Sequence, residues 1–292
     1  MTPLRQRMLH DMQIRNLAEN TQKSYLYQVS NFARHFQRSP ELLGPEEIRV
    51  WLVYLREERK LAPASLGTAI GALRFLYRVT LKRNWSDDDF PLPKKPVRLP
   101  VILSFDEVAT FFDAIPSLKQ RTILMIAYAA GLRVSEVVHL KVTDIDSKRM
   151  VIRVNQGKGR KDRYVMLSPR LLEILRTYWL DAHPRDWLFP GDIPGHPISR
   201  SAVGLACSLA RRRSGIPKPI TPHSLRHAFA THLLETGTDV RRIQLLMGHR
   251  SLATTSKYLR IATSTVCATA SPFDLLPHPE PILSPPAAPE YF

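Results

Sequence analysis

The chain has 292 residues, 44% of them hydrophobic and 23% charged, so it is long enough for two domains that each bury a core. It contains no apolar stretch as long as a membrane span and no export signal, and its only cysteines are Cys207 and Cys267. Two cysteines provide neither a disulfide framework nor a complete metal site, so we expect a protein of the reducing cytoplasm.

The positive charge is concentrated in the later part of the chain. The formal net charge is +16, and residues 91–270 hold 28 basic and 13 acidic residues, against 14 and 10 in residues 1–90. Such a basic domain indicates a polyanionic partner. Nucleic acid is favoured over an anionic membrane surface, because no predicted helix separates basic and apolar side chains onto two faces.

The first 85 residues predict a small unit of four helices. The first covers Leu4 to Ile14, and the second is expected to be capped by Asn20 and Thr21. Pro45 and Pro63 are placed to open the third and fourth, since proline suits the first helical position. Apolar and aromatic residues recur in these segments at spacings of three and four, which is typical of a helical core.

A proline-rich strap follows this unit and a proline-rich tail ends the chain. Residues 85–100 contain four prolines together with Lys94 and Lys95, which predicts an extended strap that either bridges a duplex or serves as a plain linker. The tail has seven prolines in 22 residues, and we expect it to be disordered. The predicted division is an N-terminal helical domain (1–88), the linker (89–102), a second domain (103–270) and the tail (271–292).

The second domain is predicted to be mainly α-helical with a small antiparallel β-sheet. Ser104 and Glu107 form a capping box at its first helix. A polar loop separates two short strands, Met150–Val154 and Arg163–Leu167, in the pattern of a hairpin. The other predicted helices cover Gln120–Ala130, a segment starting at Ser135, Pro169–Trp179, Ser199–Arg213, Pro222–Glu235, Asp239–Met247 and Ala253–Leu259.

Two basic residues stand at turns of this domain. Arg133 lies between two predicted helices, where Gly131 would end the first and Ser135 would cap the second. That helix boundary accounts for the glycine and the serine, but not for an arginine among apolar neighbours. Lys158 stands between two glycines at the tip of the predicted hairpin, where a lysine is usually only solvated.

Polar residues are densest where the helix at Thr221 and Pro222 begins. His223 and Arg226 are three residues apart and share a face near the helix start, where free N–H groups and the helix dipole favour an anion. This arrangement suits a phosphate. His227 and His232 lie further along the helix and are expected to be either packed or exposed.

A fourth cluster contains His249 and, in the last predicted helix, Tyr258. A single tyrosine in a helix is usually a core residue, and its spacing alone does not indicate a nucleophile.

Taken in order, these clusters resemble the tyrosine recombinase (phage integrase) family, and most closely its Xer-type and transposon-borne members. The segments that carry the resemblance are GLRVSEV (131–137), the hairpin Lys158, HSLRHAFATHLLETG (223–237), IQLLMGH (243–249) and the run from Ser251 to Tyr258. TQKSYLYQVSNFARHF (21–36) more loosely resembles the core-binding domain of that family. The resemblance implies an N-terminal four-helix SAM-like core-binding domain and a C-terminal tyrosine recombinase catalytic domain.

The resemblance also implies six catalytic positions, which are Arg133, Lys158, His223, Arg226, His249 and Tyr258. Two of them are arginines that would hold the non-bridging oxygens of a DNA phosphate, because a planar guanidinium makes several hydrogen bonds at once. His249 would hydrogen-bond the same phosphoryl group. Glu136 is expected to support these groups rather than to react.

The remaining three positions would carry the covalent chemistry. Tyr258 is implied to be the nucleophile that forms a 3′-phosphotyrosine, which conserves the phosphodiester energy. Lys158 would protonate the leaving 5′-oxygen, and His223 would accept the tyrosine proton. The resemblance therefore implies DNA cleavage and rejoining without a metal, a nucleotide or any other cofactor.

The implied partner is double-stranded DNA that carries recombination sites, and we expect a homotetramer on paired sites and a nucleoid-associated protein that is a monomer when free. Further DNA contacts are expected from five basic residues, Lys94, Lys95, Arg160, Lys161 and Arg163. The residues after the nucleophile, Leu259 and Arg260, differ from the small residue and histidine of many relatives.

Three alternatives remain open at this point. A type IB topoisomerase-like enzyme would share the chemistry but would not pair two sites. A DNA-binding protein could retain these residues only as structure. A zinc enzyme built on His223, His227 and His232 is disfavoured, because no glutamate lies between the first two and Arg226 would place a cation beside the metal.

Overall fold

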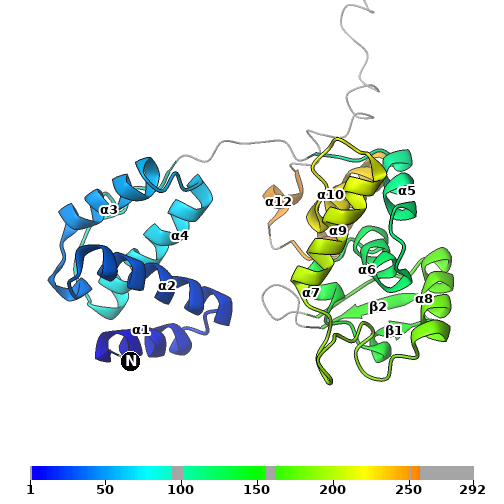
Figure 1. The fold of residues 1–292 in the computed structure, drawn as a ribbon, viewed down its shortest axis with the longest axis horizontal. Helices are drawn as coiled ribbons and strands as arrows, with labels where there is room; N and C mark the ends of the chain where they lie inside the picture. Colours follow the sequence, from blue (N-terminus) through cyan, green and yellow to red (C-terminus); the bar gives the residue numbers. More distant parts are fainter. Residues whose placement is uncertain (1, 94–100, 156–161, 250, 257–292) are drawn as a thin grey trace, which may run out of the picture. The chain divides into compact units, whose positions relative to one another are not determined.

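The computed structural model describes residues 2–93, 101–155, 162–249 and 251–256 and divides the chain into two units, Met1–Arg98 and Leu99–Phe292 (Figure 1). The finer division into four segments stays a prediction. The lysines predicted in the strap and the whole proline-rich tail lie outside the described residues.

The first unit consists of helices, as predicted. Its elements are α1 (Pro3–Ile14), α2 (Glu19–Phe36), the short η1 (Pro40–Leu42), α3 (Pro45–Glu57), α4 (Pro63–Arg74) and the π-helical turn η2 (Phe75–Thr80). Pro45 and Pro63 open α3 and α4, which confirms the role predicted for them. The predicted cap at Asn20 and Thr21 is wrong, because α2 begins earlier, at Glu19, and has no side-chain cap.

Aromatic side chains form much of the core of the first unit. Phe32 and Tyr77 are fully buried, and the Tyr77 hydroxyl donates a 2.8 Å hydrogen bond to the carbonyl oxygen of Pro40. Trp85 stacks on Tyr77 with ring centroids 4.2 Å apart, and Phe90 is also buried. The segment that follows the last helix is therefore part of this core.

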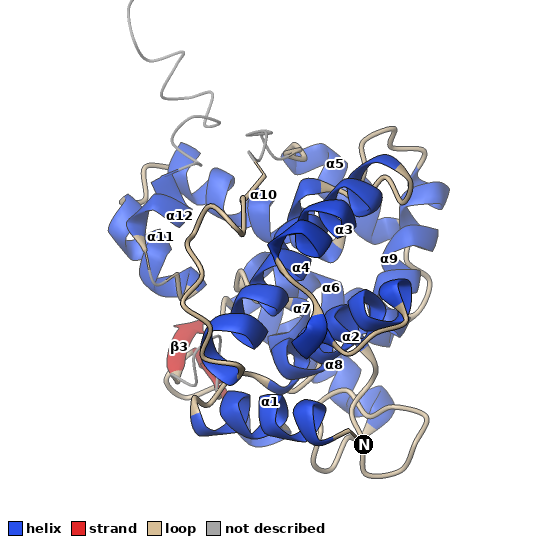
Figure 2. Ribbon diagram, turned by 90° about the vertical axis from the view of Figure 1, so that its left-hand side faces the viewer, coloured by secondary structure: helices blue, strands red, loops and turns tan. Residues whose placement is uncertain are grey.

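The second unit is mainly helical with one small sheet, which confirms the predicted fold class (Figures 1 and 2). Its elements are α5 (Phe105–Asp113), α6 (Leu118–Ala129), α7 (Val134–Val137), η3 (Val142–Asp144), β1 (Ile145–Asp146), β2 (Val151–Val154), β3 (Arg163–Met166), α8 (Pro169–Ala182), α9 (Arg200–Ser214), α10 (Pro222–Glu235), α11 (Val240–Met247) and α12 (Leu252–Ser256).

The sheet is antiparallel with the strand order β1-β2-β3. The predicted hairpin corresponds to β2 and β3, which pair from Val151 opposite Met166 to Val154 opposite Arg163. The strand β1 was not predicted, because two residues are too few to show alternation. The hairpin therefore ends, among the described residues, at the pair that contains Arg163.

Local capping explains most helix starts of this unit. Ser104 and Glu107 form the predicted capping box at α5, with hydrogen bonds of 3.1 and 2.8 Å. The cap predicted at Ser135 is wrong, because α7 begins at Val134 and Ser135 lies inside it. The Glu136 carboxylate takes the capping role by accepting from the backbone N–H of Arg133 at 2.9 Å.

The helix α10 crosses the core of the unit and packs against α6. Gly131 follows α6 with a φ of +61°, and a Cβ atom there would lie 2.3 Å from the ring of Phe229 on α10. Only glycine satisfies both conditions. This turn therefore brings the chain just after α6 directly onto α10.

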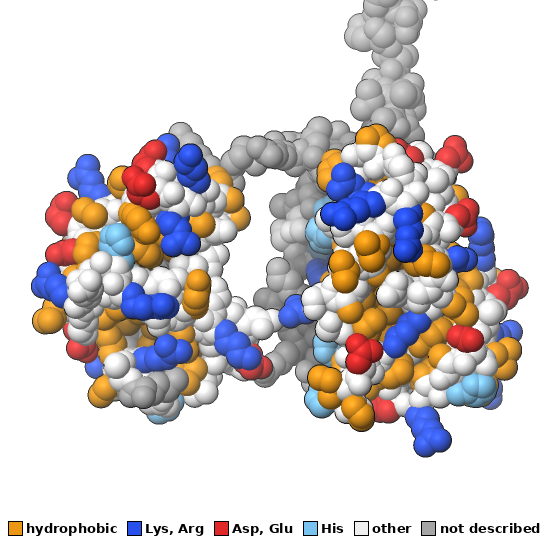
Figure 3. Space-filling model, viewed as in Figure 1, with side chains coloured by type: hydrophobic (Ala, Val, Ile, Leu, Met, Phe, Trp, Pro, Cys, Tyr) orange, Lys and Arg blue, Asp and Glu red, His pale blue; other side chains and the backbone are white. Residues whose placement is uncertain are grey.

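On the face shown in Figure 3, lysines and arginines are spread over both units and interleaved with acidic and apolar side chains. Among the described residues, no helix has the length and apolar character needed to cross a membrane.

Candidate active site

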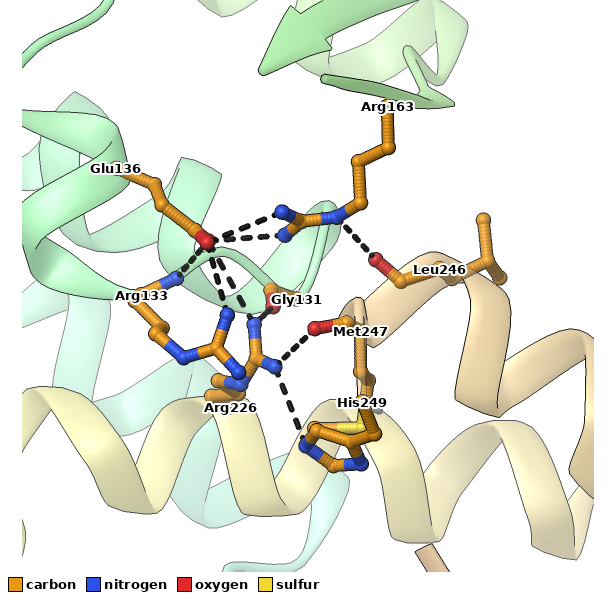
Figure 4. A network of polar contacts seen from close by, with 8 residues as sticks. All are labelled: Gly131, Arg133, Glu136, Arg163, Arg226, Leu246, Met247 and His249. Atoms are coloured by element: carbon orange, nitrogen blue, oxygen red, sulfur yellow. Dashed lines mark hydrogen bonds and ion pairs between the residues drawn. The ribbon is translucent and has the colours of Figure 1, made fainter. Parts of the chain in front are cut away.

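Glu136 of α7 is the centre of a network of three arginines (Figure 4). Arg133 donates to it from its backbone N–H at 2.9 Å and from Nη1 at 2.8 Å. Arg163 donates to both carboxylate oxygens, at 3.0 and 2.9 Å. Nη1 of Arg226 lies 3.8 Å from Oε2. One carboxylate therefore orients guanidinium groups from three separate elements.

The ionisation of Glu136 reflects this environment. Burial alone would raise the pKa of this carboxyl, since it disfavours the charged form. Hydrogen bonds and positive charge from Arg163, followed by those from Arg133, outweigh burial and lower the pKa to about 2. Glu136 is thus a carboxylate at any neutral pH, and it partly compensates the buried cations around it.

Arg226 of α10 is only 1% exposed. Its Nη1 donates to the carbonyl oxygen of Gly131 and its Nη2 to that of Met247, the last residue of α11. Nη2 also lies 3.3 Å from Nε2 of His249. The guanidinium is therefore held between the turn after α6 and the end of α11, in one fixed orientation.

His249 follows α11 and is held on both sides. Gly248 ends the helix with a φ of +60°, and the His249 carbonyl oxygen accepts from the Gln244 side chain at 3.2 Å. Nδ1 of His249 shares a 2.8 Å hydrogen bond with the hydroxyl of Thr255, a fully buried residue of α12. These contacts present Nε2 to Arg226, as Figure 4 shows.

His223 lies in the first turn of α10, as predicted, with Pro222 before it at the first helical position. Its side chain is exposed, whereas that of Arg226 is buried. The ring of His223 packs edge-on against that of His227, with centroids 4.4 Å apart. Of the two predicted site residues on this helix, His223 therefore lies at the surface and Arg226 in the interior, about one turn apart.

The structure brings together four of the residues predicted for the site, Arg133, Glu136, Arg226 and His249. The predicted Lys158 and Tyr258 lie outside the described residues, as do Arg160 and Lys161 of the loop.

Two family models match the chain. That of the phage integrase family covers residues 102–265, and that of the phage integrase N-terminal SAM-like domain covers residues 4–87. The chain belongs to the phage integrase family. It is a tyrosine recombinase, and the two matches confirm both domains that the sequence resemblance implied.

Known proteins resemble the recombinase along most of its length. A Sinorhizobium fredii protein named as an integrase/recombinase, y4qK, is 65% identical over 100% of this chain and 95% of its own length. The tyrosine recombinase XerD of Lacticaseibacillus casei is 33% identical over 87% of this chain and 92% of its own. The XerH site-specific recombinase, solved with its difH substrate after cleavage, shares the fold with a TM-score of 0.70 at 22% identity, over 90% of this chain and 83% of its own.

The sequence did not indicate that Arg163 and Thr255 belong to the network around Glu136 and His249. Arg163 was expected to contact DNA, but its side chain is 13% exposed and its Nε, Nη1 and Nη2 all donate to protein oxygens. Thr255 was noted only as part of a run of residues, and it holds His249. Glu136, the partner of Arg163, lies 27 residues away in another helix, so local spacing could not indicate this contact. Thr255 is six residues from His249, but a threonine in that run carries no signal of its own.

His232 of α10 is a structural histidine. Nδ1 shares a 2.8 Å hydrogen bond with the Tyr128 hydroxyl, and Nε2 lies 2.8 Å from the carbonyl oxygen of Leu103. The ring stacks on Phe105 at 4.0 Å, and burial lowers the pKa of this imidazole. Because both ring nitrogens are engaged, neither is left for a metal, and the three-histidine zinc alternative has no support.

We expect substitution of Glu136 by glutamine to destabilise the catalytic unit in a pH-dependent way. The pKa in the fold lies below the ordinary value of 4.5, so the ionised carboxylate stabilises the fold above pH 4.5 and this stabilisation is lost as the pH falls toward 2. The shift corresponds to about 3 kcal/mol. The free energy of unfolding of both proteins is measured in urea from pH 3 to pH 7, with amide exchange in α10 as the probe. The difference between wild type and Glu136→Gln should be present at pH 7 and should decrease below pH 4.5.

Glu107→Gln provides the matched control for this measurement. Glu107 also caps a helix and pairs with a cation, Lys218 at 2.6 Å, but its side chain is 26% exposed. Solvent screening should limit its effect to less than about 1 kcal/mol. If both variants lose the same free energy of unfolding at every pH, the buried carboxylate of Glu136 has no special role.

Proposed function

We propose that this recombinase cleaves and rejoins specific duplex DNA sites through a 3′-phosphotyrosine on Tyr258. The observation that carries the proposal is the guanidinium of Arg226, buried and held by two backbone carbonyls beside His249. A cation fixed in this way is prepared for an anion whose charge grows during a reaction. Arg133, half-buried on the same carboxylate, is the second such group.

Phosphoryl transfer requires this kind of site. As the phenol oxygen attacks phosphorus, negative charge is spread over the non-bridging oxygens. Arg133 and Arg226 would stabilise that charge. His249 would donate a further hydrogen bond when its Nε2 carries a proton and turns from Arg226 to the phosphate, with Nδ1 still held by Thr255. Glu136 holds Arg133, and the carbonyl oxygens of Gly131 and Met247 hold Arg226, so little reorganisation is needed when the phosphate binds.

The proposed proton transfers balance the reaction. The bond between phosphorus and the oxygen of Tyr258 forms while the bond to the 5′-oxygen breaks. His223, at the exposed start of α10, would take the phenol proton, and Lys158 would give a proton to the 5′-oxygen. Attack by a 5′-hydroxyl on the phosphotyrosine reverses these steps and rejoins DNA without ATP.

The wider assignments belong to the same proposal. The XerH site-specific recombinase of this fold is described as bound to a palindromic difH substrate after cleavage, which supports a duplex recombination site as the partner. We propose a homotetramer on two paired sites, a monomer in the absence of DNA, and action on the nucleoid in the cytoplasm. The basic residues of the strap and loop, Lys94, Lys95, Arg160 and Lys161, remain predicted DNA contacts.

The test uses the full chain and a duplex selected from a randomised pool by repeated binding. A nick placed close to the cleavage position lets the short 5′-hydroxyl fragment diffuse away, so the intermediate accumulates. We expect, in EDTA, a protein–DNA adduct that survives SDS and whose phosphotyrosine maps to Tyr258 by peptide mass spectrometry. No adduct, or attachment to another residue, would contradict the proposal.

A second arm separates recombination from the type IB topoisomerase alternative. A plasmid with two copies of the selected site should give exchange products, whereas a plasmid without the site should keep its supercoils. Relaxation of the site-free plasmid would favour the topoisomerase alternative. Specific binding without any adduct would favour a DNA-binding protein.

A further inference from the structure

We propose that Arg163 is a positioning residue of this recombinase, which fixes the two phosphate-binding arginines and His249 relative to one another. The inference rests on the proposed function, because it assigns Arg163 a task within that site. It replaces the expectation that this arginine contacts DNA directly.

Arg163 occupies a junction between three elements. It is the first residue of β3 and pairs with Val154 of β2. The strand β3 packs against α11, and the two lie side by side in Figure 2. The side chain runs inward from the strand to α7 and to the end of α11 (Figure 4).

The first contact of Arg163 sets the plane of the Glu136 carboxylate. Nη1 and Nη2 donate to the two oxygens separately, in the bidentate geometry that a planar guanidinium provides and an ammonium does not. Among the contacts of the described residues, two further hydrogen bonds to this carboxylate come from Arg133, and Nη1 of Arg226 lies 3.8 Å from Oε2. Without Arg163, each carboxylate oxygen would keep only its hydrogen bond to Arg133, and the connection of Glu136 to β3 would be lost. The position of the carboxylate relative to Arg226 would then be less restricted.

The second contact of Arg163 holds the last turn of α11. Its Nε donates to the Leu246 carbonyl oxygen at 3.0 Å, and the next carbonyl, that of Met247, accepts from Arg226. A Cβ atom on Gly248 would lie 3.1 Å from the Arg163 guanidinium, so the backbone passes close to it. Two guanidinium groups therefore clamp successive peptides immediately before His249.

The neighbouring strand offers a matched control. Arg153 of β2 pairs through Nε with Asp144, a carboxylate as buried as Glu136, at 3.2 Å. This pair makes no contact with Arg133, Arg226 or His249 among the contacts described. Arg153→Met removes the same charge and an ion pair to a buried carboxylate from the same sheet, although the Arg153 side chain is 46% exposed, against 13% for Arg163. It therefore reports the cost of losing a charge and an ion pair at this sheet.

The experiment compares Arg163→Met, Arg163→Lys and Arg153→Met in the full chain. Two nicked duplexes are used, one with an ordinary phosphodiester and one with a methylphosphonate at the cleavage position. We expect Arg163→Met to lower the single-turnover cleavage rate of the phosphodiester about 100-fold. DNA affinity and its salt dependence should stay within about twofold of the wild type, as for Arg153→Met.

The methylphosphonate gives the readout that a merely structural role would not change. It lacks one negative non-bridging oxygen, so the reaction depends less on well-placed arginines. We expect the deficit of Arg163→Met to shrink about tenfold on this substrate. Arg163→Lys keeps the charge but not the bidentate contact, and it should show the same pattern to a smaller degree. If Arg163→Met does not fold, the results for Arg163→Lys test whether Arg163 is a positioning residue.

Three results would overturn the inference. Cleavage by the Arg163 variants at the rate of Arg153→Met would leave Arg163 without a positioning role. A deficit equal on both substrates would indicate general destabilisation. Weaker DNA binding, together with a slope of log affinity against log salt concentration that is smaller in magnitude by about one, would indicate a direct phosphate contact. Absence of an adduct with the wild type would instead contradict the proposed function itself.

Discussion

Replacement of Tyr258 by phenylalanine is expected to abolish the covalent protein–DNA adduct. The substitution removes one oxygen atom, the proposed nucleophile, and no hydroxyl at that position remains to attack phosphorus. Loss of a nucleophile costs at least about 10⁴-fold in rate, because the binding and charge-stabilising groups cannot replace it. DNA affinity should be unchanged, because the phosphate contacts are kept. Adduct formation on the nicked duplex and binding by electrophoretic shift measure the two properties separately.

Tyr164→Phe is the control for this variant. Tyr164 lies on β3 with a side chain that is 53% exposed, and its ring lies 5.3 Å from the Arg149 guanidinium. Phenylalanine keeps the ring and removes only the hydroxyl. Adduct formation should therefore stay within about twofold of the wild type. An adduct that persists in Tyr258→Phe would place the nucleophile elsewhere and remove the basis of the proposed mechanism.

Arg226→Lys should have the second largest effect. Lysine keeps the charge but has a single nitrogen, which cannot occupy both the Nη1 position that donates to Gly131 and the Nη2 position that donates to Met247. Loss of one fixed donor to a developing anion typically costs about 10²–10³-fold, and Arg226 also orients its neighbours, so we expect about 10³-fold. Single-turnover cleavage at saturating DNA measures the effect, because saturation removes any change in affinity.

Arg121→Lys separates this loss from the general cost of replacing a partly buried arginine. Arg121 of α6 donates from Nε and Nη2 to the Ile115 carbonyl oxygen, at 2.8 and 2.6 Å, and takes no part in the Glu136 network. The cleavage rate of Arg121→Lys should stay within about twofold of that of the wild type. If both lysine variants lose activity equally, Arg226 has no special role at the phosphate.

The predictions that held depend on interactions between residues close in the sequence. Pro45, Pro63 and Pro222 begin helices because proline suits the first helical position wherever it occurs. The capping box of Ser104 and Glu107 also forms within four residues. These features need no information about the rest of the fold.

The helix boundaries that were predicted wrongly involve competition between local alternatives. Ser135 is a suitable cap by type, but Glu136 reaches back to the Arg133 N–H and the helix starts one residue earlier. The α2 helix likewise extends past Asn20 and Thr21 to Glu19. Several residues near each boundary can cap, and packing of the finished unit chooses among them.

The ordered motifs of the sequence were sufficient to identify the family and to indicate Arg133, Arg226 and His249, which the fold then brings together. The catalytic roles of these three residues, like those of Lys158, His223 and Tyr258, stay predictions.

The sequence by itself determined the class of enzyme, the helix starts set by proline and short-range capping, and the residue types of the site. Only the tertiary structure decided that Arg163 is buried against Glu136, 27 residues before it, and against Leu246, 83 residues after it. The physical reason is that an ion pair forms where packing of separate elements excludes water and aligns donors. Sequence spacing carries no information about such an alignment between distant residues.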